Sequence, residues 1–137
     1  MVSENKHFII GEIDELCSKI IGACIEVHKA LGPGLLEKIY HQCLTREFAL
    51  QGIQFQDEYA IGLSYKGIRL ESELRADFLI ENTVILEIKA VNLWNPIFEA
   101  QLITYLKLAD IPIGLLVNFN VQKLKEGVKR CFNGQLI

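Results

Sequence analysis

The first fifty residues carry apolar side chains at three- and four-residue steps, which predicts two helices. In the range 12–31 the apolar positions are Ile13, Leu16, Cys17, Ile20, Ile21, Cys24, Val27 and Leu31. Such spacing is typical of one apolar face of an amphipathic helix. The Gly-Pro-Gly sequence at 32–34 ends this pattern, and a second periodic stretch runs over 35–51 with Gly52 as its C-terminal cap. Residues 1–11 are expected to form a loose N-terminal arm.

Between positions 53 and 90 the pattern changes to short runs of the residue types that favour strands. We expect strands over 53–59, 61–65, 68–74, 75–80 and 83–90. Lys66-Gly67 predicts a tight turn, and Glu81-Asn82-Thr83 predicts a three-residue hairpin loop. Together these runs predict an antiparallel meander.

The remaining sequence predicts a strand–helix–strand unit and a last helix. Asn95-Pro96 has the residue types of a helix start, and the helix is expected to extend to about Ala109. Residues 113–117 are wholly apolar, which is typical of a strand covered on both faces. Such a crossover leaves the two strands parallel. A final helix is expected over 121–132, and the whole chain, 1–137, is expected to form a single α/β domain.

Within the stretch 75–90, charges interrupt what would otherwise be buried strands, and those that matter for chemistry are Asp77, Glu87 and Lys89. A three-residue loop at 81–83 would place Asp77 directly opposite Glu87, with their Cβ atoms about 5 Å apart. Lys89 lies two residues further on and therefore points to the same face. Two facing carboxylates in an apolar sheet repel each other unless a cation neutralises them, and a hard divalent ion such as Mg²⁺ or Mn²⁺ suits oxygen ligands.

This arrangement fits hydrolysis of a phosphodiester bond. The Lys89 ammonium can hold the attacking water and offset charge that develops on the phosphate. The alternative is that Glu87 and Lys89 form a surface ion pair on a half-exposed strand and that Asp77 is an unrelated edge residue, since Asp…Glu-x-Lys is common by chance. The flanking sequence favours the first interpretation.

Gly34, Glu37 and Tyr40 form a GxxExxY string at the start of the second predicted helix. From about Ile13 to Phe132 the chain resembles the GxxExxY proteins of the PD-(D/E)xK nuclease superfamily. Further matching segments are 75–77, 85–90, 99–107 and 114–119. The resemblance implies a restriction-endonuclease-like αβββαβ core, an α/β (α+β) fold with a mixed central sheet flanked by helices.

The resemblance also implies roles for individual residues. Asp77 and Glu87 would be the central ligands of a Mg²⁺ or Mn²⁺ ion, and Lys89 would be the catalytic lysine. Glu37 would be a further acidic ligand or hold a water molecule, and the Ile88 backbone carbonyl would be another ligand. For Glu37 the alternative is a favourable acid in the first turn of a helix.

Gln101 and Tyr105 are one helical turn apart and therefore share a face. Both are expected to reach the site as orienting hydrogen-bond partners, and the resemblance to superfamily members with a glutamine on this helix supports that role. The alternatives are core packing for Tyr105 and capping of buried backbone groups for Gln101. Trp94 is interpreted mainly as core packing, with a rim or base-stacking platform as the alternatives. No histidine, including His41, is assigned to a metal.

The charge balance limits how the chain can bind nucleic acid. Lys and Arg number 14 and Asp and Glu number 17, a formal charge of −3, so there is no basic excess for binding a duplex by charge alone. The local basic candidate is a cluster on the last predicted helix, Lys123, Lys125, Lys129 and Arg130, which is otherwise a solvated face.

The remaining composition predicts an intracellular protein without a membrane partner. The four cysteines form no CxxC pair and are expected to be core thiols. The sequence has neither a signal-peptide pattern nor an apolar run that could span a bilayer, so a reducing, cytoplasmic setting is expected.

The preferred hypothesis is a metal-dependent nuclease that acts on nucleic acid, with DNA favoured over RNA. The second hypothesis is a non-catalytic module that binds nucleic acid or protein on the same fold. The third is a structural homo-oligomer, which a mean hydropathy of +0.24 keeps open. A homodimer is compatible with the first and third hypotheses, because cutting both strands favours a symmetric pair of sites.

Overall fold

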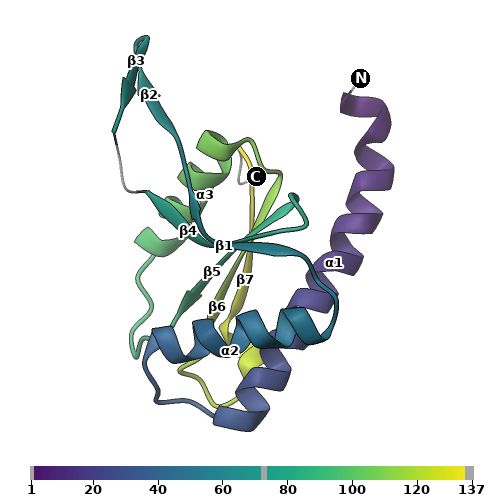
Figure 1. The fold of residues 1–137 in the computed structure, drawn as a ribbon, viewed down its shortest axis with the longest axis vertical. Coiled ribbons are helices and arrows are strands. Elements are labelled where there is room, and N and C mark those ends of the chain that lie inside the picture. Colours follow the sequence, from purple (N-terminus) through teal and green to yellow (C-terminus); the bar gives the residue numbers. More distant parts are fainter. Residues whose placement is uncertain (1, 72–73, 135–137) are drawn as a thin grey trace.

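The structure is a computed structural model that describes residues 2–71 and 74–134. Its elements follow the order α1 (Val2–Leu31), α2 (Glu37–Leu50), β1 (Phe55–Ala60), β2 (Leu63–Tyr65), β3 (Ile68–Leu70), β4 (Arg75–Ile80), β5 (Val84–Lys89), α3 (Ile97–Ala109), β6 (Ile113–Asn118), a 3₁₀ turn at Leu124–Gly127 and β7 (Val128–Phe132). Five strands form one sheet in the order β1-β4-β5-β6-β7 (Figure 1).

The sheet is mixed, as the sequence predicts. β4 pairs antiparallel with both β1 and β5, β5 pairs parallel with β6, and β6 pairs antiparallel with β7. The sheet separates two groups of buried apolar residues, one shared with α1 and α2 and the other shared with α3. The expected mixed sheet flanked by helices is therefore confirmed, with α1 and α2 on one face and α3 on the other.

The central strands β5 and β6 carry the core. Every residue of β6 is buried, which confirms the prediction of a strand covered on both faces. Gly114 allows α3 to approach β6 closely, since a Cβ atom at this position would lie 2.8 Å from the Leu102 side chain. The parallel pairing of β5 with β6, with α3 as the connection, confirms the predicted strand–helix–strand unit.

The turn between α1 and α2 is fixed by Tyr40. Its hydroxyl donates to the Gly32 carbonyl oxygen at 2.6 Å and accepts from the Leu35 backbone N–H at 3.1 Å. Its ring stacks on Phe119 with a centroid distance of 4.5 Å. Gly34 has a φ of +99°, which glycine adopts without strain. Tyr40 is thus a packing residue, and the turn determines where α2 begins.

Three predictions about elements are wrong. α1 begins at Val2 and not at Glu12, so the segment expected as a loose arm is helical from Val2. β2 and β3 do not join a meander; they form a separate hairpin, inserted between β1 and β4, that projects from the body (Figure 1). Their side chains are too exposed to hold them against the main sheet. The Lys66-Gly67 turn of this hairpin is present, with positive φ at both residues.

The third wrong prediction is the last helix, because residues 121–132 form the 3₁₀ turn and β7 instead. β6 is buried, and its backbone N–H and C=O groups on the edge away from β5 need partners. β7 supplies these partners along the pairs from Val117–Val128 to Ile113–Phe132. Pairing with β6 therefore determines the structure of this segment. Its helical pattern is short, and Gly127 weakens its tendency to form a helix.

The cysteines agree with the sequence analysis. Cys17, Cys24 and Cys131 are buried, Cys43 is partly exposed, and all four are free thiols. Within the described residues, no helix is both long enough and apolar enough to cross a membrane.

The close approach at Gly114 gives a stability prediction. Gly114→Ala forces its methyl group into the Leu102 side chain, so we expect the free energy of unfolding to fall by about 1–3 kcal/mol in urea titrations. The matched control is Gly22→Ala in α1, where the added methyl group meets no atom within 4 Å. This control should gain about 1 kcal/mol from helix propensity. Equal stability of the two variants would contradict the packing account.

Candidate active site

The centre of the site is a crossed pair of hydrogen bonds between β4 and β5. The Asp77 backbone N–H donates to Glu87 Oε2 at 2.7 Å, and the Ile88 backbone N–H donates to Asp77 Oδ2 at 2.8 Å. The residue pairing of the two strands ends at Phe78–Leu86, one step before Asp77 would face Glu87. The two carboxylates thus replace backbone partners at the point where the strands separate.

β4 also loses its pairing with β1 at the same position. Asp57 pairs with Phe78 and Tyr59 pairs with Ala76, but the pair of Glu58 and Asp77 between them is missing. Glu58 has a φ of 51°, which is uncommon for a residue other than glycine. Asp77 therefore lies where β4 opens toward both neighbouring strands.

Burial and mutual repulsion make this carboxylate pair costly to ionise. Glu87 is only 7% exposed, and burial, followed by the negative charge of Asp77, raises its pKa from 4.5 to about 8. Burial likewise raises the pKa of Asp77, although the Ile88 N–H and the positive charge of nearby groups oppose the rise. A cation between the two groups would remove this cost.

Glu37 lies at the start of α2 and belongs to the same cluster. Its pKa is raised by partial burial and by the charge of Asp77, while Lys89 and His41 lower it. Its carboxylate therefore interacts electrostatically with Asp77 of β4 and with Lys89 of β5. The structure therefore brings Glu37, Asp77, Glu87 and Lys89 together.

His41 is a site residue that the sequence analysis missed. Its Nε2 atom lies 3.4 Å from Asp57 Oδ2 and 3.9 Å from Glu58 Oε2. One ligand atom each from His41, Glu58 and Asp77 lie within 4.8 Å of one another, which suits a metal ion. The four-residue spacing from Glu37 to His41, one turn of α2, was the available signal. The position of Glu58 depends instead on the irregular step within β1, where its pairing with β4 is interrupted.

The alternation of side chains along β5 directs Glu87 and Lys89 to the face covered by α3. Lys89 Nζ lies 4.5 Å from the centre of the Phe98 ring, a cation–π contact. The Phe98 ring meets Trp94 edge to face at 5.1 Å between centroids. The amine is thus held beside the first turn of α3.

Tyr105 and Gln101 differ in their relation to the site. Tyr105 is 7% exposed, and burial, followed by the negative charges of Glu87 and Asp77, raises the pKa of its hydroxyl. Gln101 is exposed, and its side chain forms no hydrogen bond with the described residues.

The backbone of Ile88 also faces the carboxylates. Its N–H points toward β4, where it donates to Asp77. In a strand the carbonyl of a residue points to the same side as its N–H, so the Ile88 carbonyl is directed toward the carboxylates as well.

The predicted basic cluster does not form one face. Because 121–132 is not a helix, Lys123 and Lys125 lie in the turn region, while Lys129 and Arg130 are consecutive on β7 and point to opposite sides. Arg130 forms an ion pair with Asp14 at 2.9 Å. The four residues therefore do not share the helix face that the sequence predicts.

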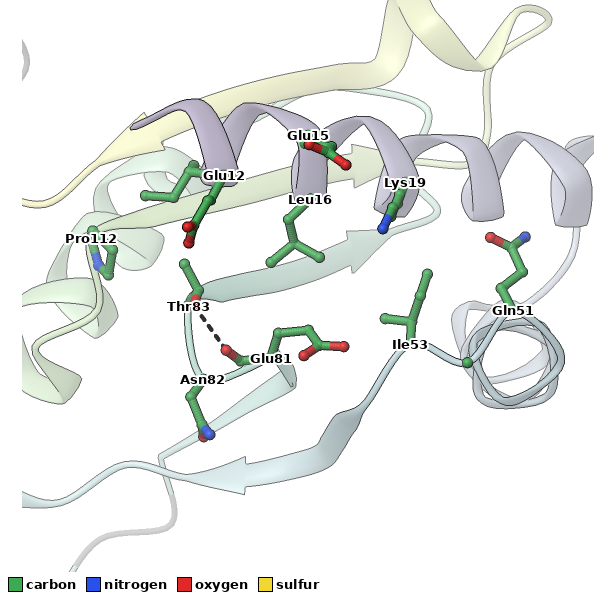
Figure 2. A pocket seen from close by; sticks show the side chains of 12 residues that line it. Glu12, Glu15, Leu16, Lys19, Gln51, Ile53, Glu81, Asn82, Thr83 and Pro112 are labelled. Carbon is green, nitrogen blue, oxygen red and sulfur yellow. Dashed lines mark hydrogen bonds between the residues drawn. The ribbon is translucent and has the colours of Figure 1, made fainter. Parts of the chain in front are cut away.

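A large open cavity of about 720 Å³ lies away from these residues (Figure 2). Its lining comes from α1, from the segment between α2 and β1, from Pro112 and from the loop that joins β4 to β5. In that loop, Thr83 donates a hydrogen bond to the Glu81 carbonyl oxygen. Asp77 and Glu87 lie toward the opposite ends of these strands. A large pocket is a usual starting point for locating a site, but the carboxylates of Asp77 and Glu87 do not line this one.

Comparison with known proteins adds one finding. A family model described as the PD-(D/E)XK nuclease superfamily matches residues 14–131. Neither the comparison with curated proteins nor that with solved structures gives a match.

The raised pKa of Glu87 predicts how stability depends on pH without divalent ions. The folded chain binds the proton of the Glu87 carboxyl group more tightly than the unfolded chain does. The contribution of this group to the free energy of unfolding is therefore complete below about pH 4.5 and is lost as the pH rises through about 8. Glu87→Gln replaces the carboxyl group with an amide that does not titrate, so the variant does not lose stability in this way. We expect it to raise the free energy of unfolding relative to wild type at pH 8 by on the order of 3 kcal/mol, and by much less at pH 5. Urea titrations in EDTA test this, and an equal difference at both pH values would contradict it.

Proposed function

Because the chain belongs to the PD-(D/E)XK nuclease superfamily, we propose that it is a metal-dependent nuclease that hydrolyses phosphodiester bonds, in DNA rather than RNA. The observation that carries this proposal is the crossed hydrogen bonding of Asp77 and Glu87. It holds two carboxylates close together in a largely buried position that raises both pKa values. A structural ion pair would bring opposite charges together there instead.

The residues present fit a hard divalent cation. The backbone hydrogen bonds use Oδ2 of Asp77 and Oε2 of Glu87, which leaves Oδ1 and Oε1 for a ligand. Glu37 and the Ile88 carbonyl would complete an all-oxygen set, which Mg²⁺ or Mn²⁺ accepts. The cation, when bound, supplies positive charge that neutralises the carboxylates and polarises a phosphoryl oxygen.

The remaining residues of the proposed site bind or orient the substrate and the attacking water. Lys89 donates hydrogen bonds to the attacking water or to a phosphate oxygen and offsets negative charge there. Phe98 holds the Lys89 amine through the cation–π contact. Tyr105 closes the buried side of the site and offers its hydroxyl as a donor toward the carboxylates. Gln101, one turn before Tyr105, would orient the substrate or water from the exposed side.

The test combines metal binding with cleavage. Mn²⁺ is titrated calorimetrically into wild type and Asp77→Ala/Glu87→Ala, and both proteins are incubated with Mg²⁺ and pools of single- and double-stranded DNA and RNA. We expect the double variant to lose metal binding and at least a hundredfold in cleavage rate, since both ligands and the charge they hold are removed. Lys89→Met should keep metal binding and lose cleavage.

The matched control is Glu26→Gln, which removes an exposed carboxylate that, within the part of the chain the structure describes, forms an ion pair only with exposed Lys29. It should bind and cleave like wild type, because exposed pairs contribute little. A wild-type protein that binds no metal would overturn the proposal. Metal binding without cleavage of any pool would favour a non-catalytic binding module.

We further propose that His41, Glu58 and Asp77 hold a second cation, with Asp77 shared between the two positions. An imidazole ligand favours Mn²⁺ over Mg²⁺. His41→Ala should therefore weaken Mn²⁺ binding about tenfold in calorimetry, roughly the effect of losing one ligand contact, while Mg²⁺ binding changes little. Gln42→Ala, an exposed neighbour on α2, is the control. Equal losses for the two metals would contradict a histidine ligand.

A further inference from the structure

An exposed apolar patch lies beside Lys89. We call it the aromatic rim and define it by four residues, Leu93, Trp94, Ile97 and Phe98. Leu93 is 85% exposed and Ile97 is 59% exposed, while Trp94 and Phe98 are half-buried against the core on the α3 face. Apolar side chains of this size, exposed together next to a charged site, need a function.

The rim adjoins the proposed catalytic amine directly. Only seven residues separate Lys89 at the end of β5 from Ile97 at the start of α3, so this short loop carries the rim past the site. Phe98 contacts the Lys89 amine, and Trp94 contacts Phe98. A group that rests on the rim is therefore next to the residues that would act on a phosphate.

The connecting segment is held in place by hydrogen bonds. The Asn118 side chain accepts from the Val91 N–H and donates to the Val91 carbonyl, both at 3.1 Å. Asn95 Oδ1 accepts from the Ile97 N–H at 3.0 Å, and Trp94 Nε1 donates to Glu99 Oε1 at 3.1 Å. The hydrogen bond from its nitrogen holds the Trp94 indole in one orientation. The aromatic rim is therefore already ordered before a ligand binds.

The chemistry of the rim fits the face of an unpaired base. Bases of a single strand stack on aromatic and apolar side chains whatever their sequence, whereas the bases of a duplex are already stacked on one another. A duplex presents mainly phosphates, and these call for a basic surface. The chain has a formal charge of −3, and its expected basic cluster is divided between the turn region and two sides of β7.

We propose that the aromatic rim binds an unpaired nucleotide next to the scissile phosphate, so that the substrate is single-stranded at the point of cleavage. This inference rests on the proposed nuclease function, because it places the base relative to Lys89. It goes beyond that function by naming the strandedness of the substrate and the residues that select it.

Trp94 provides a direct measurement, since it is the only tryptophan of the chain. Wild-type protein in Ca²⁺ is titrated with a mixed-sequence 12-nucleotide single strand and, separately, with a blunt DNA hairpin of the same base content whose loop is a non-nucleotide linker, so that this probe has no unpaired base. A gel confirms that both probes stay intact. We expect the single strand to quench Trp94 emission and to bind about tenfold more tightly than the hairpin.

Two variants test the rim itself. Leu93→Ser changes an almost fully exposed residue and leaves the core intact, and Trp94→Leu keeps apolar volume but removes the indole. Each should weaken single-strand binding about tenfold, as measured by anisotropy of a labelled strand. Leu50→Ser, at a 62% exposed apolar position at the end of α2, is the matched control and should bind like wild type.

The inference is overturned if the single strand leaves Trp94 emission unchanged, if the hairpin binds as tightly, or if Leu93→Ser and Trp94→Leu bind like the control. Different results would reject the proposed nuclease function. Single-strand binding with quenching but without cleavage in Mg²⁺ would retain the rim and reject the nuclease, whereas duplex cleavage with unchanged Trp94 emission would retain the nuclease and reject the rim.

Discussion

The site depends on the crossed hydrogen bonds between Asp77 and the strand of Glu87. A regular antiparallel ladder would pair backbone with backbone at this step, but here each carboxylate accepts a backbone N–H from the other strand. The strands must separate to admit the two side chains, and β4 parts from β1 at the same residue. The separation creates the site, and the burial that accompanies it raises the cost of two negative charges. A cation offsets that cost, which links the fold to the proposed chemistry.

The two faces of the sheet supply different groups to this opening. β5 directs Glu87 and Lys89 to the α3 face, where Phe98 and Tyr105 lie. α2, on the other face, supplies Glu37 and His41, and Asp77 lies close to groups from both sides. The turn held by Tyr40 determines where α2 starts, so a residue that packs in the core positions Glu37 and His41.

Local signals predicted that Asp77 and Glu87 lie together, and they failed where long-range strand pairing determines the structure. The three-residue loop predicted at 81–83 is present between the paired residues Ile80 and Val84, and this register brings Asp77 to Glu87. The crossed hydrogen bonds were not predictable, because they replace ladder pairs only where the strands diverge. The last segment became β7 because buried β6 needed a partner on its free edge. His41 was missed because Glu58, which lies far from it in sequence, meets it only in the fold.

The most direct test of the account is the pKa of Glu87 with and without a divalent cation, measured by NMR titration of ¹³C-labelled glutamate carboxyl groups and assigned with Glu87→Gln. The account predicts a pKa of about 8 in EDTA. Saturating Mg²⁺ should lower this pKa below 4.5, the ordinary value of the group, because the cation favours the charged form. A pKa that is the same in EDTA and in Mg²⁺ would contradict the claim that this carboxylate pair is built to hold a cation.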